Sequence, residues 1–260
     1  MSDWTIGDVT ITRVGEPDFH LVLPQDDATV ALLEANLGWL APYVDDALAL
    51  RIGSSALVVR SEGRTIVVDP WLAFEPTDDS ERAARVERLL GALRAAGIDP
   101  ADVDDVVLSH LDGLGATTAF PNARYVLPAA ELDRADAADA AARIQASGQL
   151  ATIVPDHAVT GSVRIERGEG HSPSHSVVFI ESGGRLACIA GHLFLHPAQV
   201  AGPGPRDGLD EFPVIAGQTR VELLERLADA AGVLIGPLWA APGGGTVVRS
   251  ASGYQLSPSS

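Results

Sequence analysis

The alternation of apolar and polar positions divides the chain into two β-rich halves. In the first half the strands are expected over residues 4–16 (with a turn at Gly7-Asp8), 56–60, 65–69, 103–110 and 122–128. The turn Glu62-Gly63 joins the second and third of these runs into an antiparallel hairpin. In the second half the strands are expected over residues 162–170, 176–184, 185–192, 232–238, 244–250 and 252–258.

Three segments have the three- and four-residue apolar spacing of helices. They cover residues 80–97, 129–148 and 219–232. The first ends at Gly97, and the third begins with a capping box of Thr219 and Glu222. Two β-rich halves that are each followed by helices predict an α/β protein in which two sheets are sandwiched between helix layers.

Two long segments interrupt this pattern. Residues 17–50 join the first strand to the hairpin, and residues 201–218 are rich in Gly, Pro and Asp. Excursions of this length from a compact core are often lids or partner surfaces, and otherwise they are solvated surface loops. Both interpretations stay open for each segment.

The charge of the chain excludes several classes of partner. The formal net charge is −17, and all 18 basic residues are arginines, which is typical of a GC-rich coding sequence. Such an acidic surface repels nucleic acid and anionic lipid. No apolar run reaches the length of a membrane span, the start lacks the features of a signal peptide, and Cys188 has no partner for a disulfide. We therefore expect a cytoplasmic protein.

Candidate chemistry lies at the ends of the predicted strands. His110 ends the apolar run 103–110, and Asp112 follows two residues later. His171 lies in the segment GEGHSPSH, and His192 lies in IAGHLF, directly after another apolar run. Imidazole and carboxylate groups at strand ends are typical of metal sites and of acid–base sites.

The order of these segments resembles that of metallo-β-lactamase-fold hydrolases. The segments FPNARYVLPAAELDR, GHSPSHSVVFIESGG, GHLFLHPAQV and VVRSASGYQL carry the resemblance, which extends from Trp4 to Leu256. The branch that it resembles contains methyl-parathion-hydrolase-like and lactonase-like enzymes. The resemblance implies an αββα sandwich, one domain over residues 1–260, and an active site on loops at one edge of the two sheets.

Enzymes of this family bind two metal ions through an H-x-H-x-D-H loop, a G-H-T-P-G-H segment, a T-G-D segment and a last His. The resemblance makes His110 the first loop ligand and His171 the ligand of the second segment, whereas His175 matches a His that does not usually bind metal. The loop is about two residues short, so that Asp112 stands for its second His or its Asp. His192 replaces the bridging Asp, and Pro237-Leu238 replaces the last Thr-His pair. A two-metal site is therefore not expected.

Three interpretations of the remaining residues stay open. In the leading one, His110, Asp112, His171 and His192 form a metal-free pocket of general acids and bases. In the second, the same four residues bind one Zn or Fe ion. In the third, the chain is a catalytically inactive pseudoenzyme that binds a ligand or a partner. The expected substrate is a small organic molecule, and the reaction is ester or lactone hydrolysis, or a lyase, cyclase or isomerase step of specialised-metabolite biosynthesis.

Several other residues are secondary candidates. Trp71 and Trp239 follow strands and are predicted to form an aromatic wall for the substrate, with core packing as the alternative. His196 is a further candidate for substrate contact, and in the family it is usually a loop-packing residue. Asp69 either supports the His110 loop or caps the turn at Pro70. The sequence does not determine the oligomeric state.

Overall fold

The computed structural model describes most of the chain. The described ranges are residues 3–21, 26–70, 78–111, 119–134, 137–204, 208–251 and 253–258, with the backbone alone for residues 16–21. Asp112 and Trp71 fall outside these ranges, so their predicted roles stay predictions.

Seven strands form the first sheet, in the order of the sequence. They are β1 (Asp3–Ile6), β2 (Val9–Leu21), β3 (Leu50–Ser61), β4 (Arg64–Val68), β5 (Asp105–Val107), β6 (Arg124–Pro128) and β7 (Leu150–Ile153). The strands β1 to β4 pair antiparallel, and β4 to β7 pair parallel. The predicted hairpin is confirmed: Glu62 and Gly63 both have positive φ angles between β3 and β4, as a tight two-residue hairpin turn requires.

Seven further strands form the second sheet, again in sequence order. They are β8 (His157–Ala158), β9 (Val163–Arg167), β10 (Ser176–Ser182), β11 (Arg185–Ile189), β12 (Val233–Ile235), β13 (Gly244–Ser250) and β14 (Gly253–Ser257). The pair β11–β12 is parallel and the other pairs are antiparallel. The turn at Gly183-Gly184 joins β10 and β11, as the sequence predicts.

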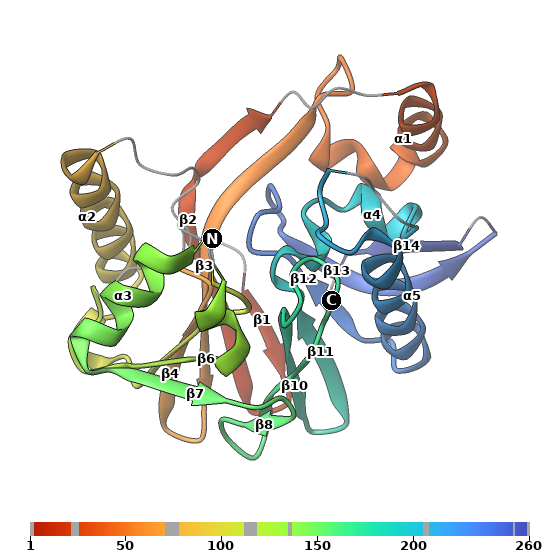
Figure 1. Cartoon of the computed structure of the whole chain (residues 1–260). Coiled ribbons are helices and arrows are strands. Elements are labelled where there is room, and N and C mark those ends of the chain that lie inside the picture. The colour runs from red at the N-terminus through yellow and green to blue at the C-terminus, as the bar shows by residue number, and fades with distance from the viewer. Residues whose placement is uncertain are drawn as a thin grey trace.

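Helices cover the outer face of each sheet (Figure 1). The α-helices are α1 (Asp27–Leu40), α2 (Asp79–Ala95), α3 (Ala138–Ser147), α4 (Ala198–Ala201) and α5 (Pro213–Asp229). Short 3-10 helices are η1 (Ala41–Tyr43), η2 (Pro100–Asp102), η3 (Ala129–Asp133) and η5 (Gly191–Phe194). One apolar cluster packs α2 and α3 on the first sheet, a second packs α1, α4 and α5 on the second sheet, and a third lies between the sheets. The predicted αββα sandwich is therefore confirmed.

Two of the predicted helices differ in their bounds. The third begins at Pro213 rather than at Thr219, because proline favours the first turn of a helix, where its missing N–H is not needed. The hydroxyl of Thr219 lies inside the helix and donates to the carbonyls of Ile215 and Glu169, so the predicted capping box is wrong.

The helix predicted over residues 129–148 is interrupted. Residues 129–133 form the 3-10 helix η3, and α3 begins only at Ala138. Arg134 has an extended backbone that ends η3, and the side chain of Glu131 points into the protein. Hydrogen bonds to Glu131 from distant loops explain this departure from the local helical pattern.

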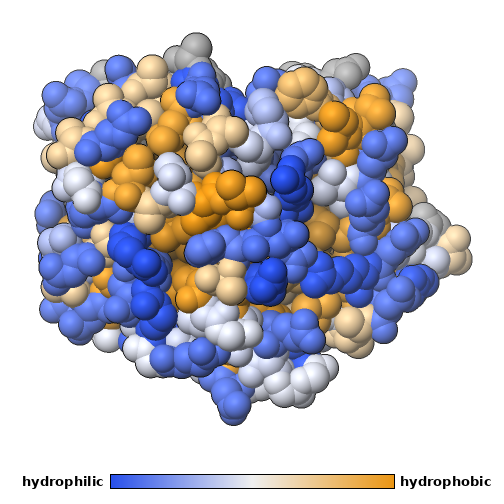
Figure 2. All heavy atoms as spheres, turned by 60° about the horizontal axis from the view of Figure 1, so that its bottom comes forward, coloured by the Kyte–Doolittle hydropathy of each residue, from blue (hydrophilic) through white to orange (hydrophobic). Residues whose placement is uncertain are grey.

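Strand β5 has two contrasting ends. At its start, the carboxylate of Asp105 is fully buried between Arg64 and Arg124, and the register pairs Asp105 with Ile66 near the β3–β4 turn. This turn lies at the bottom of Figure 1. Figure 2 brings that side forward and shows hydrophilic residues around smaller hydrophobic areas. Beyond the other end of β5, which is Val107, the chain continues to His110.

Candidate metal centre

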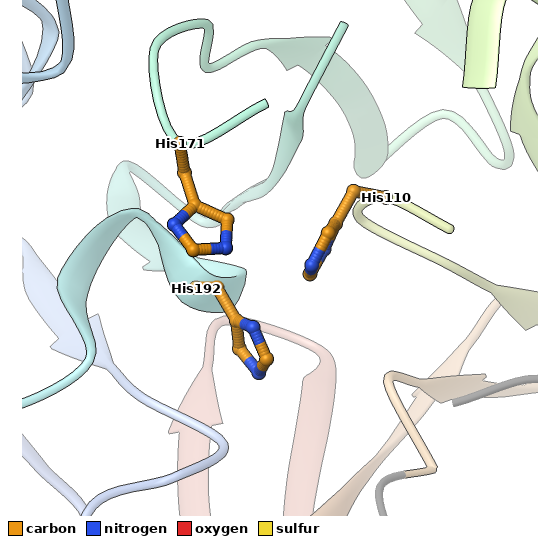
Figure 3. Close-up of side chains that lie close together, drawn as sticks. All are labelled: His110, His171 and His192. Atoms are coloured by element: carbon orange, nitrogen blue, oxygen red, sulfur yellow. The ribbon is translucent and has the colours of Figure 1, made fainter. Parts of the chain in front are cut away.

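Of the four predicted site residues, the three histidines come together at the strand ends, whereas Asp112 lies outside the described residues. His110 follows β5, His171 lies in the loop between β9 and β10, and His192 lies in η5 after β11. Their rings point toward one another from three separate segments (Figure 3). The ring centroids of His110 and His192 are 4.7 Å apart, and those of His110 and His171 are 5.0 Å apart.

The backbone before His110 is held by Asp69. The carboxylate of Asp69 is buried and accepts a hydrogen bond from the Ser109 N–H at 2.8 Å. Asp69 has a φ of 45°, which is uncommon for a residue with a side chain. The Ser109 hydroxyl lies 3.1 Å from Nδ1 of His110. Of the two interpretations of Asp69, this contact corresponds to support of the His110 loop.

His175 orients the backbone of His192. Its Nδ1 lies 3.0 Å from the carbonyl of Gly168, and its Nε2 accepts a hydrogen bond from the His192 N–H at 3.1 Å. A neutral imidazole with its proton on Nδ1 satisfies both contacts. His175 is fully buried beside the cluster, with its ring centroid 5.1 Å from that of His110. Nδ1 therefore anchors the ring to the backbone at Gly168, and Nε2 supports the backbone of His192.

The turn before His192 requires a glycine. Gly191 has a φ of +54°, and a Cβ added there would lie 2.6 Å from Oγ of Ser109 and 2.7 Å from Nε2 of His175. Only a residue without a side chain lets the loop of the second sheet approach the loop that carries His110 so closely.

His171 is supported by a buried ion pair. Its Nδ1 lies 3.4 Å from the carboxylate of Asp210, which also pairs with the fully buried Arg220 at 2.6 Å. Arg220 donates a second hydrogen bond to the carbonyl of Leu193, next to His192. Since Asp210 faces Nδ1 of His171, Nε2 is the nitrogen that remains for a ligand. The side chain of His171 is 16% exposed, so the cluster opens on its side.

Glu131 joins the loops that carry His110 and His171. Its carboxylate is fully buried, and one oxygen accepts from the Leu111 N–H at 2.9 Å. The other oxygen accepts from the hydroxyl groups of Ser172 at 2.8 Å and Ser174 at 2.5 Å. Leu111 follows His110 directly, and Ser172 follows His171 directly, so one carboxylate contacts the neighbours of both histidines.

Burial keeps most of these imidazoles neutral. It lowers the pKa of His110 well below 6.5, and the nearby His192 and His171 rings lower it further. Burial likewise lowers the pKa of His175 and of His192 well below 6.5, and in both cases His171 adds to the effect. Neutral imidazole is the form that binds a metal ion, whereas a lowered pKa disfavours the imidazolium form that a general acid would need.

The residues fit one metal ion. One ligand atom from each of His110, His171 and His192 lies within 4.8 Å of the others. Zinc bound by imidazole nitrogens at about 2.0–2.1 Å in a tetrahedral site separates its ligands by roughly 3.3 Å, so small shifts of the rings suffice. Three neutral nitrogen donors suit zinc or ferrous iron.

Two secondary candidates lie in packed surroundings. Trp239 is fully buried in the cluster beneath the second sheet, and its Nε1 donates to the carbonyl of Phe194 at 2.7 Å. The Nε2 of His196 lies 2.8 Å from the carbonyl of Tyr43, and its Nδ1 accepts from the Ala198 N–H. Both side chains are thus packed as their packing alternatives describe, and their contact with a substrate stays a prediction.

The family of the chain follows from a comparison with family models. The model of the Metallo-beta-lactamase superfamily matches residues 50–237, which is more than half of the chain. The chain therefore belongs to the metallo-β-lactamase superfamily. A search of curated proteins finds no match.

Solved structures agree with this fold over the whole chain. The dizinc quorum-quenching lactonase AidC is 18% identical, covers 100% of this chain and 97% of its own, and has a TM-score of 0.79. The hydrolase AbOPH is 19% identical with the same coverage and a TM-score of 0.80. A probable metal-dependent hydrolase from Staphylococcus aureus is 14% identical, covers 99% of this chain and 100% of its own, and has a TM-score of 0.73.

The residues that support the histidines are those that the sequence reasoning missed. Glu131, Asp210 and Arg220 were not candidates, although Glu131 follows β6, which lies next to the strand that ends before His110. A carboxylate directly after a parallel strand is a usable signal, because neighbouring parallel strands end at one edge of the sheet. Asp210 and Arg220 lie on another segment and gave no such signal.

Proposed function

We propose that this protein is a hydrolase of small esters or lactones that works with one divalent metal ion bound by His110, His171 and His192. The observation that carries the proposal is the convergence of three imidazole ligand atoms within 4.8 Å of one another. Membership of the metallo-β-lactamase superfamily and the fold shared with a dizinc lactonase support it. Asp112 is kept in the proposal as a carboxylate that joins the cluster.

The second metal ion of related enzymes is not part of the proposal. His20, His157 and His196 are the histidines outside the cluster, and no histidine follows residue 196. His157 is exposed in β8, and His196 bonds to Tyr43. Of the described side chains, neither His157 nor His196 is placed to offer a further imidazole to a second ion at the cluster.

The metal supplies the chemistry that the protein groups lack. When bound, the ion acts as a Lewis acid that lowers the pKa of a water molecule and polarises a carbonyl oxygen. The carboxylate of Asp210 faces Nδ1 of His171, and His175 holds the backbone of His192. Burial of His110 and His192 limits the access of bulk water, so the open side of His171 is where a substrate enters.

The surface beside His171 supports a substrate with an apolar part. Phe212, Val214 and Ile215 are exposed at the start of α5. The N–H of Phe212 donates to the carbonyl of Gly170, which precedes His171. Exposed apolar side chains near a candidate site are a common place for a ligand to bind.

The wider setting is also part of the proposal. We infer that the chain acts as one domain in the cytoplasm, on a small molecule rather than on nucleic acid, in specialised-metabolite biosynthesis. Among the described residues, no helix is both long and apolar enough to cross a membrane. The acidic charge of −17 supports the exclusion of nucleic acid.

Metal content and chelation test the proposal. Protein purified without chelator should hold about one equivalent of zinc or iron, and a panel of aryl esters and lactones should be hydrolysed. Removal of the ion should abolish turnover, and zinc or cobalt should restore it. Two equivalents at this site would contradict the single-ion site. Turnover that survives chelation would favour metal-free acid–base catalysis by the same histidines, and no turnover with any ion would favour the inactive alternative.

A further inference from the structure

The two loops that carry His110 and His171 belong to different sheets. His110 follows β5 of the first sheet, and His171 precedes β10 of the second sheet. The ligands of a site must be held within about 0.5 Å of the productive geometry, by packing together with supporting hydrogen bonds. A polar group that contacts both loops would set the distance between them more closely.

Glu131 is such a group. Its two carboxylate oxygens face opposite partners: Oε2 faces the N–H of Leu111, and Oε1 faces the hydroxyls of Ser172 and Ser174. All three hydrogen bonds are 2.5–2.9 Å long, and the carboxylate is fully buried. Hydrogen bonds to a charged acceptor are about twice as strong as neutral ones, and burial strengthens them further.

A second contact extends the same link. Arg134 lies 3.7 Å from Oε2 of Glu131 and 3.2 Å from the carboxylate of Glu211. The N–H of Glu211 donates to the carbonyl of His171 at 3.1 Å. Glu131 therefore contacts the His171 loop directly through two serines, and a second time through Arg134 and Glu211.

We propose that Glu131 is a positioning residue that fixes the placement of His110 relative to His171. Since it touches the neighbours of the ligands and not the ligands themselves, its effect is on geometry. The inference deepens the proposed function, because the placement of these two rings sets the affinity for the ion. The placement itself exists with or without an ion.

An uncharged replacement would weaken the link on at least one side. In Glu131→Gln the amide has one acceptor oxygen, so it cannot accept both from the Leu111 N–H and from the serine hydroxyls on the opposite side. The serine hydroxyls can rotate and accept a hydrogen bond from the new amide NH2 group, but the Leu111 N–H can only donate. We expect the two loops to separate slightly, with loss of affinity for a metal ion.

Asp105→Asn is the matched control. Asp105 is also a fully buried carboxylate of the first sheet, at the opposite end of β5, and it contacts only arginines among the partners that the structure shows. This change removes a buried charge of the same type without touching either histidine loop. A drop in affinity that both variants share would reflect general destabilisation.

Cobalt titration of the metal-free protein provides one test. Glu131→Gln should bind Co²⁺ about tenfold or more weakly than the wild type, the scale expected for a group that orients metal ligands. The visible absorption bands of bound Co²⁺ should also change. Asp105→Asn should bind Co²⁺ as the wild type does. Unchanged affinity and spectrum in Glu131→Gln, with Co²⁺ bound by the wild type, would overturn the inference and leave the metal site standing.

NMR spectra of the imidazoles provide a test that needs no metal. In the metal-free protein, Glu131→Gln should shift the ring resonances of His110 and His171 and leave those of the exposed His157 in place. If the wild type binds no Co²⁺, the proposed function fails, and the NMR shifts still decide the inference. Ring resonances that stay in place would overturn it.

A variant of the partners covers the case in which Glu131→Gln does not fold. Ser172→Ala with Ser174→Ala removes the hydroxyls on the His171 side and keeps the hydrogen bond from the Leu111 N–H. The His171 resonances should then shift more than those of His110, and Co²⁺ affinity should fall about tenfold. If the His110 and His171 ring resonances are the same in this variant and in the wild type, Glu131 does not position these two histidines.

Discussion

The two ends of strand β5 treat a buried carboxylate in opposite ways. At the start of the strand, Asp105 is held by two arginines, Arg64 and Arg124, which are partly exposed to solvent. Beyond the other end, Glu131 accepts from an N–H and two hydroxyls, and Arg134 is placed between Glu131 and Glu211. One end has two cations for one anion, and the other has two anions for one cation.

The two ends of β5 therefore differ in their charge balance, and we assign them different roles. A carboxylate between two arginines is compensated and needs nothing more, so the Asp105 end serves to pair strands. The Glu131 end has neutral imidazoles and an excess of negative charge, an environment that favours a bound cation. The same sheet therefore has a charge-compensated end and an end that, under the proposed function, receives a cation.

The largest expected effect lies at the ligand end. His192→Ala removes one of three imidazoles, so affinity for Zn²⁺ should fall by more than about a hundredfold, beyond the loss expected for groups that only orient ligands. Turnover at a fixed low zinc concentration should fall with it. Isothermal titration with Zn²⁺ measures the affinity, and Asp105→Asn serves as the control. Equal affinities in His192→Ala and the wild type would place the ion elsewhere.

The second-largest expected effect is a loss of stability in acid, caused by the buried histidines of the ligand end. Burial lowers the pKa values of His110, His175 and His192 below 6.5, so the unfolded chain takes up protons that the folded protein does not. The free energy of unfolding of the metal-free protein should therefore fall as the pH drops below about 7, by up to roughly 1.4 kcal/mol per pH unit for each ring. Above pH 7 these rings contribute no pH dependence.

Urea unfolding at several pH values measures this effect. His175→Gln should reduce the slope between pH 7 and 5, because one of the three rings is gone, whereas Asp105→Asn should keep the slope of the wild type. If His175→Gln and the wild type have the same slope of the free energy of unfolding against pH, the His175 ring is not buried in its neutral form.

The compensated end should show a smaller effect, on stability alone. Asp105→Asn leaves Arg64 and Arg124 without their anion, but both can reach solvent, so we expect a loss of about 1–2 kcal/mol in the free energy of unfolding. Zinc affinity should stay unchanged. A tenfold weaker affinity for zinc in this variant would break the separation between the two ends of β5.

The smallest effect is expected at the rim of the site. Phe212→Ser removes an exposed apolar side chain beside the His171 loop, so KM for an ester with an apolar group should rise about threefold with little change in kcat. KM for a small polar ester serves as the control and should not change. An equal rise for both substrates would point to a general disturbance of the loop.

The sequence predicted the sandwich and the ends of its strands well. Alternation, glycine turns and apolar runs are local signals, which explains why the hairpin at Glu62-Gly63 could be predicted. The candidates His110, His171 and His192 came instead from the resemblance to the family, which implies that these positions converge. The bounds of η3 and α5 could not be predicted. Hydrogen bonds from distant segments to Glu131 interrupt the first helix, and Pro213 starts the second one six residues before the expected capping box at Thr219. The ion pair of Asp210 with Arg220 depends on packing between segments, which no local pattern encodes.

The glycine turn before His192 also bears on how such a site can change in evolution. The path of the chain at Gly191 is set by its contacts with Ser109 and His175, not by the side chain that follows it. Histidine and aspartate codons differ by a single base, and the family pattern has aspartate at the place of His192. An ancestor could therefore have exchanged one ligand for the other without rebuilding the loop. The short mutational distance makes His192→Asp a natural starting point for laboratory selection of a different metal preference.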